Sequence, residues 1–420
     1  MSDGARPSAS IPRLAAAPWR AFLLVFAVHV GIHGFLLTRL RTDLVRPHTR
    51  WEVTAVAMSL YERGEFADPY CLPTGKTAHM PPFHPFLIAG VYHLLGPTLA
   101  AGYTVWLILI ACHGAMFGML PWLGGRLGLP RGAGLLGGLV GAAIPRMPGY
   151  VEAPAAIAIG LMMAAFLRRW EERSATAAGS LLLGLAIGLA FHVVPSLLPV
   201  ALGLAAFELF WLRGRARRRT ALAVAGMVLA CVPWTWRNHE ALGGLFFMRS
   251  NFGLELRMGN HEGAGANLDR SAQGGTERHP RTNEEEARKV QRLGELPYMR
   301  AAGREATAWI RSHPGEFLRL TGLRFLQFWF GPVDDGLLAL WTSILTLLAA
   351  LGAWRAFPLL SVPRRAAILI PLALFPLVHY VVGYEGRYRQ PMDGIVLLLA
   401  AAGVAALLGR RNAEEGPRCA

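Results

Sequence analysis

Long apolar segments separated by short, arginine-rich loops are the feature that most limits how this 420-residue chain can fold. Hydrophobic residues make up 53% of the sequence and charged residues 16%, and the mean hydropathy is +0.36. A soluble domain of this length cannot bury so much apolar surface, whereas a lipid bilayer covers it along every span. The pattern therefore predicts a multi-pass membrane protein.

About ten segments come close to the roughly 20 residues that a helix needs to cross a bilayer. Backbone groups in lipid must be paired within the segment, so we expect each span to be an α-helix and the fold to be all-α. The predicted spans are 18–38, 99–123, 132–147, 152–168, 175–192, 194–212, 220–236, 336–354, 366–383 and 390–409. The first seven lie within 18–236 and the last three within 336–409, with terminal tails at 1–17 and 410–420.

The formal net charge of +15 comes from arginines that lie beside the spans, as in the cluster 213–219. We interpret them as topology signals rather than as a nucleic-acid-binding surface. A cytoplasmic N-terminus places most of the arginine clusters inside and leaves only Arg146, Arg387 and Arg389 in short outer loops. The positive-inside rule then predicts that both termini are cytoplasmic and that the long loops 39–98 and 237–335 are outside, in the periplasm. Arginine usage with almost no lysine favours the inner membrane of a bacterium.

The two long loops contain helical patterns of their own. Apolar residues at helical spacing predict a helix over 51–64, and charged helices are expected at 283–294 and 298–312. The segment 316–330 has an amphipathic pattern that suits a helix lying in the outer headgroup layer. The apolar stretch 83–96 is short for a span and predicts an interfacial or re-entrant helix.

Several short motifs occur in one order along nearly the whole chain. They are Glu52 after the first span, Ala57-x-x-Leu60-x-x-x-Gly64-x-Phe66, Pro73-Thr74-Gly75-x-Thr77-Ala78-x-x-Pro81-Pro82, Pro233-Trp234-x-x-Arg237-Asn238, Arg249-Ser250-Asn251-Phe252-Gly253, His313-Pro314-x-x-Phe317 and Arg387-Tyr388-x-x-Pro391. In these motifs the chain resembles the GT-C type membrane glycosyltransferases, which use polyprenyl-phosphate sugars and include protein O-mannosyltransferases and the lipid A aminoarabinose transferase. The resemblance implies a sugar transfer to a hydroxyl acceptor, which is a lipid, a protein or an envelope glycan.

Such a transfer needs a base for the acceptor hydroxyl and cations for the departing phosphate. The resemblance implies that Glu52 is the base. Members of the family carry the first-loop acid several positions earlier than Glu52, so Asp43 is the competing candidate. Glu152 stands at the outer start of the fourth predicted span, where an ionisable residue is costly without a partner or a function, and we expect it in the substrate site.

The remaining candidate site residues are expected to bind substrate. Arg387 is well placed for the donor phosphate because arginine offers a fork of donors to phosphate oxygens. Tyr388, Arg237 and Arg249 are further candidates for the same group. His79 is interpreted as part of a rigid wall of the sugar site. Asn251 is expected to bind substrate because it belongs to the motif Arg249-Ser250-Asn251-Phe252-Gly253.

The same sequence also offers other functions. A multi-pass transporter or flippase of a lipid-linked or anionic substrate is the second hypothesis, although no internal repeat supports it. His29 and His33 share one helical face but are interpreted as packing partners rather than haem ligands. No dense carboxylate cluster occurs, so we expect no metal and no cofactor, with a divalent ion left possible because some relatives use one. Membrane lipids are expected partners and nucleic acid is not.

Overall fold

The computed structural model describes residues 17–40, 42–130, 132–145, 149–172, 176–268 and 278–414. Helices are the regular elements of this described part, and strands are absent from it apart from two isolated bridges. The all-α prediction is confirmed to that extent.

The first half of the chain contains helices of very different length. They are α2 (Pro18–Leu37), α3 (Thr42–Val45), α4 (Glu52–Arg63), α5 (Phe83–Leu95), α6 (Leu99–Gly118), α7 (Leu120–Leu127), α8 (Ala133–Ala143), α9 (Glu152–Glu172), α10 (Ala177–Phe191), η1 (Pro195–Leu197) and α11 (Leu198–Trp211). The second half contains α12 (Gly214–Leu242), α13 (Phe252–Gly259), α15 (Glu284–Leu293), α16 (Glu295–Ser312), α17 (Pro314–Phe330), α18 (Gly336–Ala356), η3 (Phe357–Leu359), α19 (Val362–Leu374), α20 (Leu377–Val382), η4 (Gly386–Arg389) and α21 (Gln390–Glu414).

Seven helical stretches of the described chain are long and apolar enough to cross a membrane. They are Pro18–Leu37, Leu99–Leu127, Glu152–Glu171, Gly214–Leu242, Gly336–Leu359, Val362–Val382 and Gly386–Leu408. Each coincides with a predicted span. The other three predicted spans, 132–147, 175–192 and 194–212, coincide with the shorter apolar helices Ala133–Ala143, Ala177–Phe191 and Pro195–Trp211. At 1.5 Å per residue the 11-residue α8 is only about 16 Å long, half the thickness of a bilayer core.

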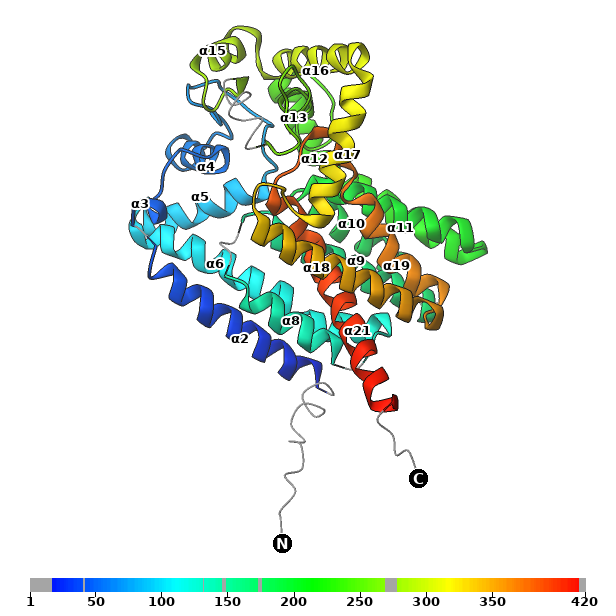
Figure 1. The fold of residues 1–420 in the computed structure, drawn as a ribbon. Coiled ribbons are helices and arrows are strands. Elements are labelled where there is room, and N and C mark those ends of the chain that lie inside the picture. The colour runs from blue at the N-terminus through cyan, green and yellow to red at the C-terminus, as the bar shows by residue number, and fades with distance from the viewer. Residues whose placement is uncertain are drawn as a thin grey trace, which may run out of the picture.

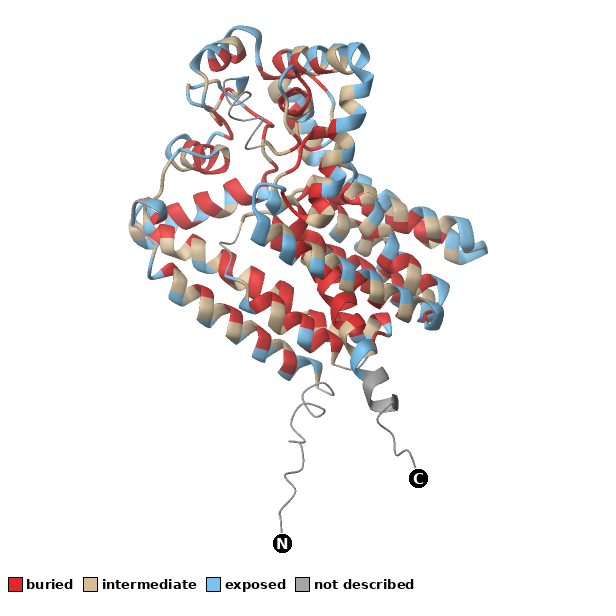
Figure 2. Cartoon of the chain, viewed as in Figure 1, coloured by how far each residue is buried: buried red, intermediate tan, exposed pale blue. Residues whose placement is uncertain are grey.

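The helix α21 occupies the middle of the helical bundle. It packs against α8, α9, α18 and α19, and buried residues concentrate along it (Figures 1 and 2). Small residues let its neighbours approach closely, since a Cβ at Gly352 of α18 would collide with the carbonyl oxygen of Leu399. The η4 turn that carries Arg387 and Tyr388 is therefore attached to a well-packed element.

The predicted helices of the two long loops are present. Helix α4 ends where Gly64 adopts a φ of +69°, a conformation that glycine adopts without steric cost. Helices α15, α16 and α17 cover the segments expected to be charged or amphipathic, and α5 covers the short apolar stretch. The start of α2 and the end of α21 lie at one end of the molecule, and α13, α15 and α16 lie at the opposite end (Figure 1).

Hydrogen bonds join the two long loops to each other. The backbone NH of Cys71 donates to the carbonyl oxygen of Pro280 over 3.3 Å, and the side chain of Gln291 donates to that of Pro73 over 2.5 Å. A third bond runs from the Ser250 NH to the Ala78 carbonyl oxygen at 3.0 Å. The two loops therefore form one layer at one end of the helical bundle.

Candidate functional site

Hydrogen bonds fix the segment Thr77–His79 of the first loop to the second loop. The buried carboxylate of Glu295, the first residue of α16, accepts hydrogen bonds from the Thr77 hydroxyl, the Ala78 NH (2.8 Å) and the Ser250 hydroxyl (2.6 Å). Burial raises the pKa of Glu295, and these three donors oppose the rise. The arrangement fixes the backbone that presents His79.

Arg237 also holds this segment. Its two terminal nitrogens donate to the carbonyl oxygens of Thr77 (2.6 Å) and Phe66 (3.0 Å). The guanidinium lies 5.2 Å from the ring centre of Phe66 and 5.0 Å from that of Trp234. The sequence suggested Arg237 for substrate binding, but both terminal nitrogens of its guanidinium are hydrogen-bonded to the protein backbone.

A side-chain nitrogen of His79 and a carboxylate oxygen of Glu52 lie within 4.8 Å of each other, so the two residues belong to one site. The hydroxyl of Tyr70 is 3.1 Å from His79 Nδ1, which leaves Nε2 for the site side of the ring. Burial, followed by the nearby cations, lowers the pKa of His79 well below its ordinary value, so the imidazole is neutral at pH 7. A wall role for His79 is compatible with this placement.

Two second-loop residues complete the surroundings of Glu52. His279 Nε2 lies 3.7 Å and Arg281 Nε lies 3.3 Å from Glu52 Oε1. Burial lowers the pKa of His279 to about 4. Both residues escaped sequence reasoning because they lie more than two hundred positions from Glu52 and belong to no recognisable spacing.

Glu52, His79 and His279 are the residues of the described chain that would hold a divalent ion. One ligand atom from each lies within 4.8 Å of the others. Two neutral imidazoles and a carboxylate form a ligand set that suits Zn²⁺ with an open position. Arg281, however, already places a cation beside the same carboxylate. Sequence spacing predicted no metal here, and only the tertiary fold brings the trio together.

A cavity of about 450 Å³ lies next to this cluster. Five of the predicted substrate-binding residues line it together: Glu152, Arg249, Asn251, Arg387 and Tyr388. Its other walls are mostly apolar and include Val151, Ala155, Val193, Val194, Pro195, Leu198, Pro199, Phe247, Phe252, Phe375, Val378 and Val382. The cavity therefore combines a long apolar lining with a small set of charged groups.

The charged groups of this cavity lie in two pairs. Arg387 Nε is 3.9 Å from Oε1 of the buried Glu152, and its guanidinium also bonds to Glu385 at 2.8 Å. About half of the Arg387 side chain remains exposed, so it can still contact a ligand. Tyr388 stacks on His379 at 4.4 Å between ring centres, which fixes its ring against the wall.

The second pair lies on the opposite loop. Asn251 Nδ2 donates to Glu255 Oε1 over 2.6 Å, and Arg249 Nη2 is 3.9 Å from the same oxygen. Glu255 lines the cavity as well and was not predicted, although it stands four residues after Asn251 in a helix.

Glu52 does not line this cavity, and the link between the two parts runs through the segment His79–Pro81. Met80 and Pro81 line the cavity, while the preceding His79 faces Glu52. Asp43, the competing base, lies in α3, and its side chain is outside the described part of the chain.

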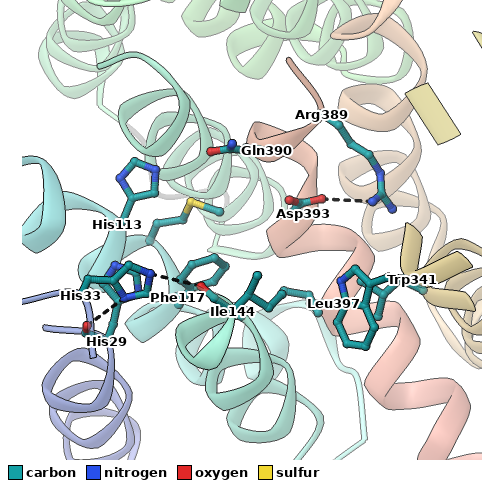
Figure 3. Close-up of a pocket in the computed structure, with 13 residues that line it drawn as sticks. His29, His33, His113, Phe117, Ile144, Trp341, Arg389, Gln390, Asp393 and Leu397 are labelled. Carbon is teal, nitrogen blue, oxygen red and sulfur yellow. Dashed lines mark hydrogen bonds and ion pairs between the residues drawn. The ribbon is translucent and has the colours of Figure 1, made fainter. Parts of the chain in front are cut away.

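The membrane histidines form a separate cluster in the bundle. Figure 3 shows His29 and His33 side by side, with His113 above them and the Arg389–Asp393 pair across a small cavity of about 30 Å³. His33 is bonded to the carbonyl oxygens of His29 (3.0 Å) and Ile144 (3.1 Å), and the His29 and His33 ring centres are 3.8 Å apart. This tight stacking agrees with a packing role and leaves no room for a haem between the rings.

No family model, no curated protein and no solved structure matches this chain.

Proposed function

We propose that this protein is a membrane glycosyltransferase that moves a sugar from a polyprenyl-phosphate donor to a hydroxyl acceptor at the outer membrane face. The observation that carries the proposal is the 450 Å³ cavity, in which Arg249 and Arg387 stand among largely apolar walls. A polyprenyl phosphate likewise combines a long apolar chain with an anionic end group. Apolar side chains suit the chain, and forked guanidinium donors suit the phosphate.

In the proposed reaction the acceptor oxygen attacks the anomeric carbon of the donor. The bond between that carbon and the phosphate oxygen breaks, and the polyprenyl phosphate leaves with the electron pair. Glu52 takes the acceptor proton, and the configuration at the anomeric carbon inverts. A phosphate monoester is a good leaving group at neutral pH because its second pKa is about 6, so no strong general acid is needed.

Arg387 and Arg249 are assigned to the phosphate charge that grows as this bond breaks. Glu152 holds Arg387 from the buried side, and Asn251 and Glu255 offer oxygen and nitrogen groups to sugar hydroxyls. Tyr388 forms the wall beside the phosphate, and His79 lies between Glu52 and the cavity-lining residues Met80 and Pro81. Arg237 is reassigned from substrate to the support of the His79 segment.

The proposed topology has ten spans with both termini in the cytoplasm of a bacterium and both long loops in the periplasm. The seven long helices and the three shorter ones together supply this number. The arrangement of the long loops at the end opposite to the start of α2 and the end of α21 supports the pairing of the termini (Figure 1). The use of arginine with almost no lysine is the feature on which the bacterial inner membrane is proposed.

The test is sugar transfer by the purified full-length protein in liposomes. A panel of radiolabelled polyprenyl-phosphate sugars is offered with total envelope lipid and protein as acceptors, and label in the acceptor and free polyprenyl phosphate are both measured. Arg387→Ala is compared with Arg355→Ala, a cation on α18 that lies outside the cavity. Movement of donor across the bilayer without label transfer would establish a flippase instead. Transfer that persists in EDTA would agree with the prediction that no resident metal takes part.

A further inference from the structure

A second cavity, of about 300 Å³, lies at the outer ends of two predicted spans. Leu40, just after α2, and Gly102, in the first turn of α6, both line it. Residues that end or begin a span lie at the boundary between lipid and water. In the proposed topology the cavity therefore lies at the height of the lipid headgroups.

One short segment separates the two cavities. Tyr150 lines the second cavity, and its neighbours Val151 and Glu152 line the first. Trp51 and Thr54 of the α4 region form another wall of the second cavity. Glu52 stands next to Trp51 in the chain but does not itself line this cavity.

The second cavity differs from the first in its charge. Arg46, His48 and Arg50 line it, and no acidic residue does so among the side chains that the structure describes. Across the side chains that the structure describes, no carboxylate forms an ion pair with Arg46 or Arg50. Unpaired guanidinium groups around a recess favour an anionic ligand, because each offers several fixed donors.

Aromatic and aliphatic side chains form the remaining walls. They are Leu40, Leu44, Val45, Trp51, Ile88, Tyr92, Val105, Trp106 and Tyr150. Tryptophan and tyrosine favour the membrane interface, where one side of the ring is apolar and the other is wet. A soluble anion such as inorganic phosphate has no apolar part that could pack against these walls, whereas an amphiphile has one.

We propose that this cavity binds the acceptor and that the acceptor is an anionic, lipid-anchored molecule. Its phosphate or carboxylate contacts Arg46, His48 and Arg50, and its apolar part lies against the aromatic walls. Trp51 connects this cavity to the surroundings of Glu52, since the Arg281 guanidinium lies 4.7 Å from the ring centre of Trp51 and 3.3 Å from Glu52 Oε1. The role of this ligand as the acceptor rests on the proposed transferase function, whereas the binding of an anionic lipid does not.

Binding is tested first, without any catalysis. Purified full-length protein in detergent is incubated with dioctanoyl phosphatidic acid that carries a photoreactive tail, and crosslinked peptides are identified by mass spectrometry. We expect crosslinks within residues 40–54 and 92–106, and at least about tenfold weaker labelling with the zwitterionic phosphatidylcholine of the same chain length. Equal labelling by both lipids would overturn the proposal.

Variants locate the site. Arg46→Gln combined with Arg50→Gln should reduce labelling by about tenfold or more, and the corresponding double lysine variant should recover part of it. Arg39→Gln is the matched control, because Arg39 is an exposed cation at the same end of α2 that does not line the cavity. Excess glycerol phosphate should compete weakly, and full competition would assign the site to a free phosphate compound instead.

The acceptor role is tested separately from transferase activity. Once a donor that transfers its sugar has been found, label on anionic lipid should fall in the double glutamine variant, while donor labelling of the first cavity stays unchanged. Undiminished transfer to an anionic lipid would remove the acceptor role from this cavity but leave the transferase function standing. Failure of every donor to react, with lipid labelling intact, would reject the transferase function and retain the lipid site.

Discussion

The Arg249 guanidinium donates a 2.7 Å hydrogen bond from Nε to the carbonyl oxygen of His79. Arg249 lines the large cavity, and the ring of His79 lies against Glu52. This bond therefore joins the proposed phosphate site to the proposed base through one residue of the first loop.

Glu52→Gln should lower turnover by about 10²-fold or more, the usual scale for the loss of general-base catalysis. Donor affinity should stay near the wild-type value, because Glu52 does not line the donor cavity. Single-turnover transfer and equilibrium donor binding measure the two effects. An active Glu52→Gln protein together with an inactive Asp43→Asn protein would transfer the role of base to Asp43.

Arg387→Ala should weaken donor binding and also slow the chemical step, because the phosphate loses charge-assisted donors in both states. Arg387→Lys should recover only part of each effect, since an ammonium group cannot reproduce a forked contact. The alanine variant also leaves the buried Glu152 without its cation, so Glu152→Gln in the same background should restore stability but not donor affinity. Unchanged donor affinity in Arg387→Ala would reduce Arg387 to a headgroup anchor.

Arg237→Ala should destabilise the loop layer by about 2 kcal/mol, because two carbonyl oxygens lose a charged donor. Donor affinity of the protein that remains folded should change little. Thermal unfolding and donor binding are compared with Arg292→Ala, an exposed cation of α15. A stable variant with lost donor binding would return Arg237 to the substrate site.

The neutral imidazole of His279 should make the loop layer sensitive to acid. Burial lowers the pKa of His279 to about 4 in the folded protein, whereas an unfolded histidine titrates near 6.5. Between about pH 6.5 and 4 the histidine is protonated in the unfolded chain and neutral in the folded protein, so the free energy of unfolding falls as the pH is lowered through this range. Above pH 6.5 the histidine is neutral in both states and has no effect on the pH dependence of stability. The melting temperature of His279→Gln should decrease less than that of wild type over this interval. Parallel curves for the two proteins would contradict the burial of a neutral imidazole.

Impermeant thiol labelling tests the topology. Cys71 is an exposed free thiol in the first long loop, and it should react in intact cells while Cys419, which lies outside the described residues, should not. Partial desolvation of this thiol raises the pKa of Cys71, so its labelling should accelerate as the pH is raised from 7 to 9. Variants that lack Cys112 and Cys231 remove the background. Labelling of Cys419 alone would invert the membrane orientation and place both long loops in the cytoplasm.

Local chemistry made much of the fold readable from the sequence. Apolar stretches located the spans because lipid exposure requires continuous hydrophobicity, a property of neighbouring residues. The end of α4 at Gly64 and the position of α17 followed from turn chemistry and helical periodicity in the same way. The actual lengths were less accessible, since α8 ends at Ala143, before the end of its apolar segment.

The composition of the site was accessible only in part. Motifs pointed to Arg249, Asn251, Arg387 and Tyr388, and the position of an acid at the start of a span pointed to Glu152. The fold places all five around one cavity. Tertiary structure alone decided that His279 and Arg281 surround Glu52, that Glu295 holds the His79 segment and that Arg237 bonds to a backbone 160 residues away. Hydrophobic periodicity and helix signals act over a few residues, whereas these partners meet because two distant loops pack against each other, and no local pattern records that packing.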